Sequence, residues 1–494
     1  MHTLADIYHL CLKNRWQGSV IQASLGKSLN GNYITEATSE LLILYKSAGI
    51  RFGDRVIVKT DHSYQTILTM ICLWSMGTVV VPVKKDILEK ELDVISKDCN
   101  ARFIIEPNNK EIINSKFYQK KTEVFITTIQ QRVSGSDLAL IIYTSGSAGK
   151  PKGVMLTHNN VITALNSIIE YLNIIAQDII LCISPISFDY GLYNIFFAFK
   201  TGCTVVLYDK PVQPLILLQT INKFNVTILP VVPAIAISIE RTLHLFKQKL
   251  DSLKKITNTG GHLPEVTING LRKKMPFVKI FAMYGLTESK RALYLPPEDI
   301  DRKRGSVGIP MPGLEAKIFK EQYQQDGSKY YIETETNEIG VLYLRGASVM
   351  QRYCDTKAKG GTEIISGEYR DDNWLNTGDL FLRDEEGYFY FKGRSKDLIK
   401  QGGYCIYPRD IEDHVLKHPN VYLCTVLGQF DQQENEIAHI FINLQEDSKE
   451  RRDELHKWLS EEIDSNSLPR KITFSSNIPL TDNGKIDKAK LATI

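Results

Sequence analysis

The segment from Tyr143 to Val154 reads YTSGSAGKPKGV and combines hydroxyl groups, glycines and lysines within a short stretch. Glycine permits backbone angles that other residues resist, so the N–H groups of such a loop can turn toward one anion. Serine and threonine hydroxyls add donors, and lysines add positive charge. The segment therefore predicts a phosphate-binding loop, with these candidate residues: Thr144, Ser145, Gly146, Ser147, Gly149, Lys150 and Lys152.

The composition of this loop also resembles that of an ordinary surface turn and of a nucleotide P-loop. An ordinary surface turn has a similar composition, because glycine, serine and lysine are all common there. A nucleotide P-loop reads G-x-x-x-x-G-K-[ST], but here Thr144 replaces the first glycine and Pro151 follows Lys150. The function of the loop therefore depends on motifs elsewhere in the chain.

Six further motifs follow the loop, and their order along the chain is informative. They are Gly260-Gly261-His262-Leu263, Met283-Tyr284-Gly285-Leu286-Thr287-Glu288, Leu375-Asn376-Thr377-Gly378-Asp379, Gly393-Arg394-Ser395-Lys396-Asp397, Gly402-Gly403-Tyr404 and Asn483-Gly484-Lys485-Ile486-Asp487. Together with the loop, this series resembles the adenylate-forming superfamily, which includes acyl-CoA synthetases, luciferases and the adenylation domains of peptide synthetases. The resemblance covers essentially the whole chain.

The resemblance implies a site for ATP and Mg²⁺. Tyr284 is expected to stack on adenine and Thr287 to contact the α-phosphate, while Glu288 holds Mg²⁺ through hard oxygen ligands. Asp379 is expected to accept hydrogen bonds from the ribose hydroxyls, with Arg394 nearby. Taken alone, Asp379 would equally suit the capping of a turn. Three glycines are also implied beside the nucleotide: Gly260, Gly261 and Gly285.

Lys485 is predicted to act in catalysis together with Thr287 and Glu288. It follows a turn at Leu480–Gly484 that can push a long cationic side chain into a cleft, where the ammonium group stabilises developing negative charge. A lysine this close to the end of a sequence is otherwise a solvated surface residue. The motif around Lys485 favours the catalytic interpretation.

The resemblance also implies a second conformation for the thiol reaction. In it the C-terminal domain pivots about Asp397, and Gly402 and Gly403 replace Lys485 near the active site. The two glycines then leave room for a narrow phosphopantetheine arm. Two-state closure of this kind needs hinge residues that absorb a large backbone change.

Asp189 is the residue on which the predicted substrate depends. The Phe188-Asp189 pair resembles one in amino-acid-activating relatives, where the carboxylate binds the substrate ammonium in a charge-assisted pair. Alternatively, Asp189 caps a helix that runs from Tyr190 toward Phe199. The resemblance adds further acid-pocket candidates: Tyr193, Thr257, Thr259, Met283 and Arg291.

These residues favour the ATP-dependent activation of a carboxylic acid, taken as an amino acid. The acid would become an acyl-AMP with release of pyrophosphate and then pass to the phosphopantetheine thiol of a separate carrier protein. The alternative is an acyl-CoA ligase for a small or fatty acid, with a structural Asp189. A hydrolase gains no support, since the motifs G-x-S-x-G and H-E-x-x-H are absent from the sequence. A silent nucleotide sensor would have little use for Lys485.

Composition narrows the possible partners and the cellular location of the protein. Sixty basic and fifty-seven acidic residues leave a formal charge of +3 without a long basic run, so no nucleic-acid partner is expected. Eight scattered cysteines form no C-x-x-C pair, which fits a reducing cytoplasm. The N-terminus does not resemble a signal peptide, and the longest apolar stretch, 228–239, is interrupted by Pro230 and Pro233. No membrane association is therefore expected.

The elements that must position these residues belong to an α/β protein of two or three domains, because 494 residues exceed one ordinary hydrophobic core. Strand-like and helix-like segments alternate through residues 1–393, which predicts an N-terminal adenylation core domain of layered helices and largely parallel sheets. The phosphate loop is expected between a strand at 138–142 and a helix that reaches Leu172. Residues 394–397 are expected to form the hinge, and 398–494 a small, mobile α+β lid.

Overall fold

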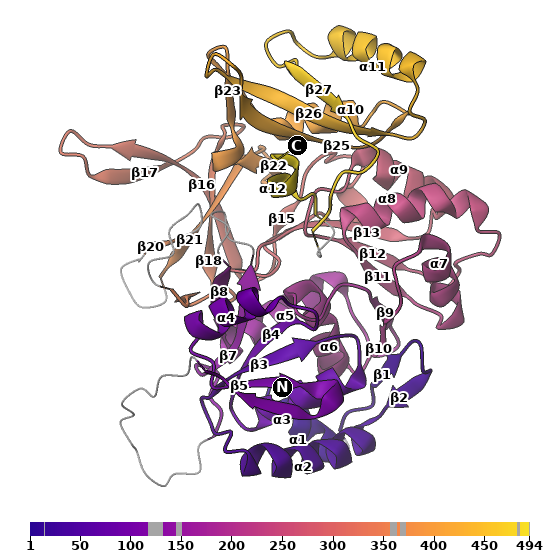
Figure 1. The fold of residues 1–494 in the computed structure, drawn as a ribbon, viewed down its shortest axis with the longest axis vertical. Coiled ribbons are helices and arrows are strands. Elements are labelled where there is room, and N and C mark those ends of the chain that lie inside the picture. Colours follow the sequence, from indigo (N-terminus) through magenta and orange to yellow (C-terminus); the bar gives the residue numbers. More distant parts are fainter. Residues whose placement is uncertain are drawn as a thin grey trace.

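The computed structural model describes residues 1–13, 15–116, 132–144, 151–355, 363–365, 372–481 and 485–493 (Figure 1). Its large N-terminal part contains two sheets whose central strands are parallel and whose edges are antiparallel. The strands of the first sheet, in spatial order, are β19 (Arg352–Tyr353), β8 (Lys152–Thr157), β7 (Leu138–Thr144), β4 (Val79–Lys84), β3 (Arg55–Thr60), β5 (Phe103–Glu106) and β6 (Glu111–Asn114). Those of the second are β15 (Ile309–Pro310), β14 (Leu293–Tyr294), β13 (Lys279–Tyr284), β12 (Lys255–Asn258), β11 (Ile228–Val231), β9 (Ile179–Cys182), β10 (Thr204–Leu207), β1 (Ser19–Gln22) and β2 (Lys27–Leu29).

Helices accompany both sheets, as the predicted alternation requires. They are α1 (Asp6–Leu12), α2 (Gly31–Ser47), α3 (Tyr64–Ser75), α4 (Glu89–Asp98), α5 (His158–Leu172), α6 (Asp189–Thr201), α7 (Pro214–Lys223), α8 (Pro233–Thr242) and α9 (Glu265–Lys274). Figure 1 shows α7, α8 and α9 beside the second sheet and α1 to α3 at the opposite end of the molecule.

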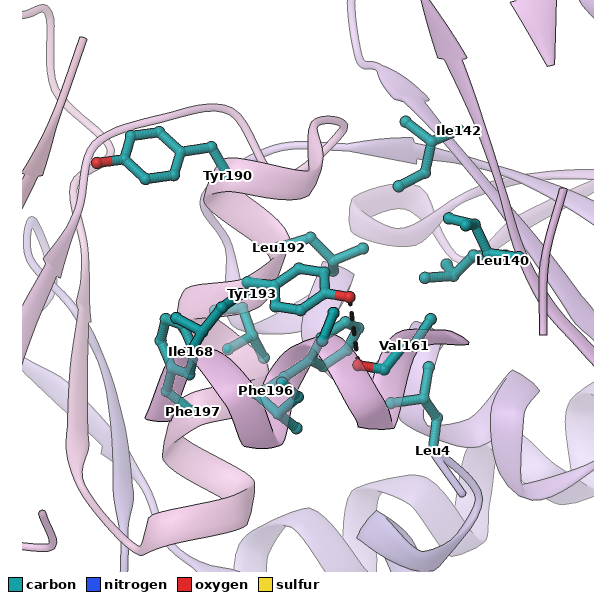
Figure 2. Close-up of a cluster of buried hydrophobic side chains, with 14 of the residues drawn as sticks. Leu4, Leu140, Ile142, Val161, Ile168, Tyr190, Leu192, Tyr193, Phe196 and Phe197 are labelled. Atoms are coloured by element: carbon teal, nitrogen blue, oxygen red, sulfur yellow. Dashed lines mark hydrogen bonds between the residues drawn. The ribbon is translucent and has the colours of Figure 1, made fainter. Parts of the chain in front are cut away.

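The largest core lies between the two sheets, where α5 packs against the first sheet and α6 packs against α5 and the second sheet. Figure 2 shows Leu140 and Ile142 of β7 facing the side of α5 that carries Val161. The aromatic residues Phe196 and Phe197 of α6 belong to the same buried cluster. Burial of this apolar surface, at about 25 cal/mol per Å², fixes α6 and therefore the position of its first residue, Asp189.

The predicted strand–loop–helix arrangement around the phosphate loop is wrong. Residues 152–157 form strand β8, which pairs antiparallel with β7, and α5 begins only at His158. The continuous apolar run Val154-Met155-Leu156 is buried as a strand, and Thr157 then starts the helix through a capping box with Asn160. The loop therefore connects two antiparallel strands.

The α/β alternation was predicted to continue through residue 393, but in the structure it ends before residue 314. Residues 314–394 contribute an antiparallel sheet, seen at the left of Figure 1, with the polar segment near 321–337 as a β16–β17 hairpin. Its strands are β16 (Leu314–Tyr323), β17 (Lys329–Glu333), β18 (Gly340–Gly346), β20 (Glu363–Ile365), β21 (Trp374–Arg383) and β22 (Phe389–Arg394). The sheet matters because β21 and β22 carry Asp379 and Arg394.

The small C-terminal part has a hydrophobic core of its own, drawn from residues between Ile399 and Phe474. Its elements are β23 (Ile399–Gln401), β24 (Tyr404–Ile406), α10 (Pro408–Val415), β25 (Val421–Phe430), β26 (Glu436–Leu444), α11 (Lys449–Glu462), β27 (Lys471–Phe474) and α12 (Lys488–Leu491). These strands and helices give the region the α+β character that the sequence predicts. The hinge at residues 394–397 stays a prediction, and its last three residues form a short 3₁₀ turn.

Within the described ranges, no helix has both the length and the apolar character that a membrane span requires.

Candidate active site

The candidate site begins at the carboxyl ends of β12 and β13, two parallel neighbours in the second sheet. Loops that leave the same edge of parallel strands meet there. The loop after β13 turns sharply at Gly285, where a methyl group would lie 2.0 Å from the carbonyl oxygen of Lys290 and 2.8 Å from the Cα of Arg291. Only glycine fits this crossing, which brings residues 287–291 back across the start of their own loop.

Tyr284, Asp379 and Arg394 form one connected group. Asp379 and Arg394 are opposite each other on β21 and β22, with Arg394 Nε 3.4 Å from Asp379 Oδ1. The Tyr284 hydroxyl donates to Asp379 Oδ2 at 2.6 Å. Burial and the charge of Glu288 raise the pKa of Asp379, while Arg394 and the Tyr284 hydrogen bond lower it. A carboxylate has about four acceptor positions, so Asp379 can still accept hydrogen bonds from a diol.

Glu288 is buried beneath this group, with 7% of its surface exposed. The Tyr353 hydroxyl donates to Glu288 Oε1 at 2.6 Å, which orients the carboxylate and leaves acceptor capacity for a hard cation. Thr287 lies in the adjacent turn, where its carbonyl oxygen accepts a hydrogen bond from the Lys290 ammonium group. Among the described residues, no cluster of three or more His, Cys, Asp or Glu side chains could hold a metal ion.

Lys485 reaches this site from the C-terminal part of the chain. A methyl group on Gly260 would lie 3.5 Å from Lys485 Cε, so the lysine lies directly above the Gly260 turn. Gly260 has φ +84°, in the left-handed region that favours glycine. Lys485 keeps access to solvent, yet the surrounding protein and the charge of Arg394 lower the pKa of its ammonium group, against the opposing effect of Asp189, Asp379 and Glu288. All three carboxylates are thus within electrostatic reach of Lys485.

The predicted hinge and thiol residues lie outside this cleft. Asp397 ends the short turn at Ser395–Asp397, and its Oδ2 is 3.4 Å from the Nζ of Lys488. Gly402 and Gly403 form the exposed tip of the β23–β24 hairpin, with φ values of +58° and +86°. A methyl group on either glycine would meet no atom within 4 Å. In this conformation, the hairpin tip faces solvent, and Lys485 faces the residues that are predicted to bind the nucleotide.

Three further contacts, made by His262 and Arg241, join the C-terminal part to the N-terminal part. His262 Nε2 lies 3.1 Å from Asp413 Oδ1. Arg241 donates from Nη2 to the Val421 carbonyl oxygen at 3.0 Å, and its guanidinium lies 4.4 Å from the ring centroid of Tyr422. These contacts hold the orientation that keeps Lys485 over Gly260.

Asp189 is the first residue of α6 and is partly buried. Its Oδ1 accepts a hydrogen bond from the backbone N–H of Tyr190 at 2.9 Å. An acidic residue in the first turn also stabilises a helix by its interaction with the helix dipole. The capping role weighed for Asp189 is therefore wrong: the N-cap residue is Phe188, which makes no side-chain cap hydrogen bond, and Asp189 lies inside the first turn.

The other predicted acid-pocket residues have different surroundings. Tyr193 is fully buried in the core, and its hydroxyl donates to the Val161 carbonyl oxygen at 3.2 Å (Figure 2). This hydroxyl is therefore unavailable to a ligand. Thr257, on β12, is linked through its Oγ1 and its carbonyl oxygen to the Tyr190 hydroxyl. Thr259 is buried just after β12.

An aromatic wall lies next to these residues at the end of β13. Met283 is buried, and its sulfur accepts a hydrogen bond from the Tyr171 hydroxyl at 3.0 Å. Tyr171 stacks on Tyr294 with ring centroids 4.1 Å apart. The rings of Tyr190 and Tyr193 lie 4.7 and 5.6 Å from the guanidinium of Arg291. The wall is thus made of ring faces.

Lys290 and Arg291 place two adjacent cations in the interior, with 2% and 3% of their surfaces exposed. Burial lowers the pKa of Lys290 to about 8, against the raising effect of Asp189 and Glu288. Lys290 has φ +68°, an uncommon angle for a residue with a side chain. The site therefore contains two buried cationic side chains, which an ordinary apolar pocket lacks.

The predicted phosphate loop is only partly described. Thr144 ends β7 and pairs with Lys152, the first residue of β8. The Nζ of Lys152 lies 5.2 Å from the ring centroid of Tyr353, the residue that orients Glu288. The remaining predicted loop residues lie outside the described ranges: Ser145, Gly146, Ser147, Gly149 and Lys150.

Sequence reasoning missed several residues of the site. Tyr353 follows no motif, and nothing in its sequence context signals contact with Glu288. Lys290 lies in the polar run Ser289-Lys290-Arg291, whose composition does not predict that it is buried. Tyr190 was treated only as the start of a helix.

Two family models match this chain. Residues 42–354 match the model described as AMP-binding enzyme, and residues 410–485 match the AMP-binding enzyme C-terminal domain.

Individual relatives match over most of the chain. It is 26% identical over 520 residues to the long-chain-fatty-acid–CoA ligase of Bacillus subtilis (strain 168), which covers 94% of this chain and 90% of that protein. It is 32% identical over 376 residues to 4-coumarate–CoA ligase-like 4 of Oryza sativa subsp. japonica, covering 74% of this chain and 65% of that protein.

Solved structures show the same fold. The anthranilate CoA ligase AuaEII in complex with anthranoyl-AMP superimposes with a TM-score of 0.84 at 24% identity, covering 99% of this chain and 96% of that one. The o-succinylbenzoate CoA synthetase of Bacillus subtilis, in complex with its acyl-adenylate intermediate, gives a TM-score of 0.80 at 24% identity, with 98% and 97% covered.

Proposed function

Because this chain belongs to the AMP-binding enzyme family, as its sequence motifs predicted, we propose that it is an acid–CoA ligase that acts through an acyl-adenylate. In the first step, a carboxylate oxygen of the acid attacks the α-phosphorus of ATP and the bond to pyrophosphate breaks. In the second step, the thiol sulfur of CoA attacks the acyl carbon. The bond to AMP then breaks and the thiol proton is lost.

The position of Lys485 over the Gly260 turn carries this proposal. Attack of one anion on another requires neutralisation of charge and correct positioning more than it requires a base. Lys485 brings a flexible ammonium group from the C-terminal part to a cleft that already contains Asp189, Glu288 and Asp379. There it can neutralise the charge that develops between the acid and the α-phosphate.

The surrounding residues supply the nucleotide contacts. Asp379 binds the ribose hydroxyls, supported by Arg394 and Tyr284. Glu288 suits Mg²⁺, which is commonly held by one or two carboxylates together with substrate phosphates. When bound, the ion would neutralise phosphate charge during the displacement. Tyr353 keeps the Glu288 carboxylate in place.

The surroundings of Asp189 favour an acid without an α-amino group. A buried carboxylate needs a compensating charge. Lys290 is a fixed ammonium group close enough to Asp189 for the carboxylate to raise its pKa, and Asp189 also accepts the Tyr190 N–H. A substrate ammonium is therefore not needed to balance Asp189. The amino-acid substrate predicted from the sequence remains the competing proposal.

The thiol acceptor is proposed to be CoA. Relatives that match most of this chain are CoA ligases by name, among them the Bacillus subtilis enzyme with 90% of its length covered. This supports the alternative weighed from the sequence over a separate carrier protein, for which no relative named here gives support.

The division of labour between the two steps can be tested with Lys485→Ala. We expect ATP–pyrophosphate exchange to fall by about 100- to 1,000-fold, the usual effect of removing one transition-state contact. Thioester formation from presynthesised acyl-adenylate should stay within a few-fold of wild type. Lys457→Ala, an exposed lysine on α11, is the matched control and should change neither rate. Equal loss of both half-reactions in Lys485→Ala would contradict the assignment.

The acid class can be read from the same exchange assay with pairs of acids that differ only in the α-amino group. The deaminated member should be preferred. Preference for the amino acid, abolished by Asp189→Ala, would restore the amino-acid proposal. Exchange that stays at the background rate with every acid would indicate a nucleotide-binding protein that is not a ligase.

A further inference from the structure

Arg291 is a buried cation whose hydrogen-bonding capacity is unfilled. Its side chain is 3% exposed, and neither Nε nor Nη1 has a hydrogen-bond partner. Arginine remains charged at any pH a protein experiences, so it cannot relieve burial by losing its proton. A buried charge without a partner is strongly unfavourable, which makes Arg291 a group that awaits an acceptor.

The neighbours of Arg291 satisfy it only in part. The rings of Tyr190 and Tyr193 lie 4.7 and 5.6 Å from the guanidinium carbon and offer cation–π contacts. Such contacts act on the face of the guanidinium, whereas its N–H groups point outward in its plane. Among the described residues, neither Nε nor Nη1 of Arg291 finds an acceptor.

The nearby polar groups are already engaged with one another. The Tyr190 hydroxyl donates to Thr257, the Tyr193 hydroxyl to Val161 and the Tyr171 hydroxyl to Met283. Asp189 is balanced by Lys290 and accepts the Tyr190 N–H. Arg291 thus remains as a charged donor at the aromatic wall, and what it lacks is an anion.

From this arrangement we propose that Arg291 binds a second carboxylate of the substrate, so that the enzyme activates one end of a dicarboxylic acid. The inference rests on the proposed ligase function and specifies its substrate class. One carboxylate reacts beneath Lys485, and the other accepts hydrogen bonds from Arg291 while the carbon skeleton between them lies on the tyrosine rings. Binding of the second carboxylate completes a site that is otherwise left with unpaired donors.

Selectivity should follow from the same geometry. A site built to bind a polar group rejects an analogue that lacks it, because the protein donors then stay buried and unpaired. A monocarboxylic acid of equal length would leave Arg291 in that condition. The preference should therefore be larger than the few-fold differences produced by chain length.

The test is ATP–pyrophosphate exchange by the full-length protein with matched acids. The panel pairs aliphatic and aromatic dicarboxylic acids with their monomethyl esters and with monocarboxylic acids of equal length. We expect kcat/KM for the preferred dicarboxylic acid to exceed that of its monoester by at least about 100-fold. Exchange supported best by monocarboxylic acids or monoesters would overturn the inference while the ligase function stands. Absence of exchange with every acid in the panel would overturn the ligase function itself.

Variants at position 291 separate charge recognition from packing. Arg291→Met retains length and apolar bulk, and we expect it to lower kcat/KM for the dicarboxylic acid by about 100-fold or more while the monoester gains or stays equal. Arg291→Lys should recover part of the dicarboxylate activity because it restores the charge. The affinity for ATP, measured by calorimetry, should be unchanged in both. Equal losses for both members of each acid pair would contradict the assignment.

Discussion

The charge of a single residue, Lys290, makes the charge balance of the site depend on pH. Its ammonium group is buried and donates to the Thr287 carbonyl oxygen, between the charges of Asp189 and Glu288. Burial brings its pKa to about 8, below its ordinary value. Lys290 is therefore charged below pH 8 and loses its proton as the pH rises above it. Loss of that charge removes one of the cations that compensate Asp189 and Glu288.

We accordingly expect kcat/KM for the acid to fall as the pH rises through about 8. Lys290→Arg keeps its charge throughout this range and should remove that fall. Lys290→Met should show at pH 7 the low value that wild type shows only at high pH. Steady-state pyrophosphate exchange between pH 6.5 and 9.5 measures all three proteins. A profile in Lys290→Arg with the same fall as wild type would assign it to another group.

Individual residues also show where prediction from sequence ends. Asp379 and Arg394 are neighbours as the motifs implied, because each motif lies on one of two paired strands. Tyr193 was chosen as a pocket residue, but its spacing on α6 serves a core position equally well, and its hydroxyl faces Val161. The interior location of Lys290 and Arg291 depends on the crossing at Gly285, which no local pattern signals.

That crossing is the feature to test at the scale of a structural element. The loop after β13 passes so close to itself that a methyl group on Gly285 would overlap backbone atoms of Lys290 and Arg291. Backbone atoms cannot move aside as a flexible side chain does. We expect Gly285→Ala to cost about 1–3 kcal/mol of unfolding free energy, the usual range for overpacking, and to lower pyrophosphate exchange at least tenfold.

Chemical denaturation and exchange assays would measure both effects. Gly31→Ala is a suitable control, since the nearest atom to the added methyl group is 3.6 Å away, at the first residue of α2. Its stability should equal or slightly exceed that of wild type. A Gly285→Ala protein as stable and active as the control would show that the loop tolerates displacement.

Elements were predicted well where periodicity and length agreed. The sequence predicts strands at 55–58 and 79–83 and a helix at 64–76. They appear as β3, β4 and α3, each within two residues of its expected ends. Strand β8 was missed because a short apolar run such as Val154-Met155-Leu156 can belong to a strand or to a buried helix. The antiparallel pairing of residues 314–394 depends on long-range partners, so single-segment patterns could not separate it from the preceding α/β layers.

At the scale of the whole molecule, several polar contacts join the two parts, among them an ion pair between Lys392 and Asp410. His262 meets Asp413, and Arg241 meets Val421 and Tyr422. Partly exposed pairs of this kind contribute only about 0–1 kcal/mol each. Such contacts can select one orientation and still be weak enough to break, as the proposed rotation of the C-terminal part would require.

Removing these contacts should therefore affect the two half-reactions differently. We expect the double variant His262→Ala/Arg241→Ala to lower the single-turnover rate of adenylate formation by about 5- to 10-fold, as loss of roughly 1 kcal/mol in the closed orientation implies. Thioester formation from presynthesised adenylate should be unchanged or faster. Arg272→Ala breaks a surface pair with Asp301 within the N-terminal part and serves as the control. A slower thioester step in the double variant would contradict this interpretation.

The opposite placements of Lys485 and the Gly402–Gly403 hairpin have a consequence in time. While Lys485 lies over the Gly260 turn, the hairpin tip is exposed to solvent. If the hairpin has the thiol role proposed from the family resemblance, one molecule could not be arranged for both reactions at once, and the two steps would alternate in the same cleft. One set of nucleotide contacts would then serve two successive reactions, and the orientation of the small domain would determine which reaction occurs.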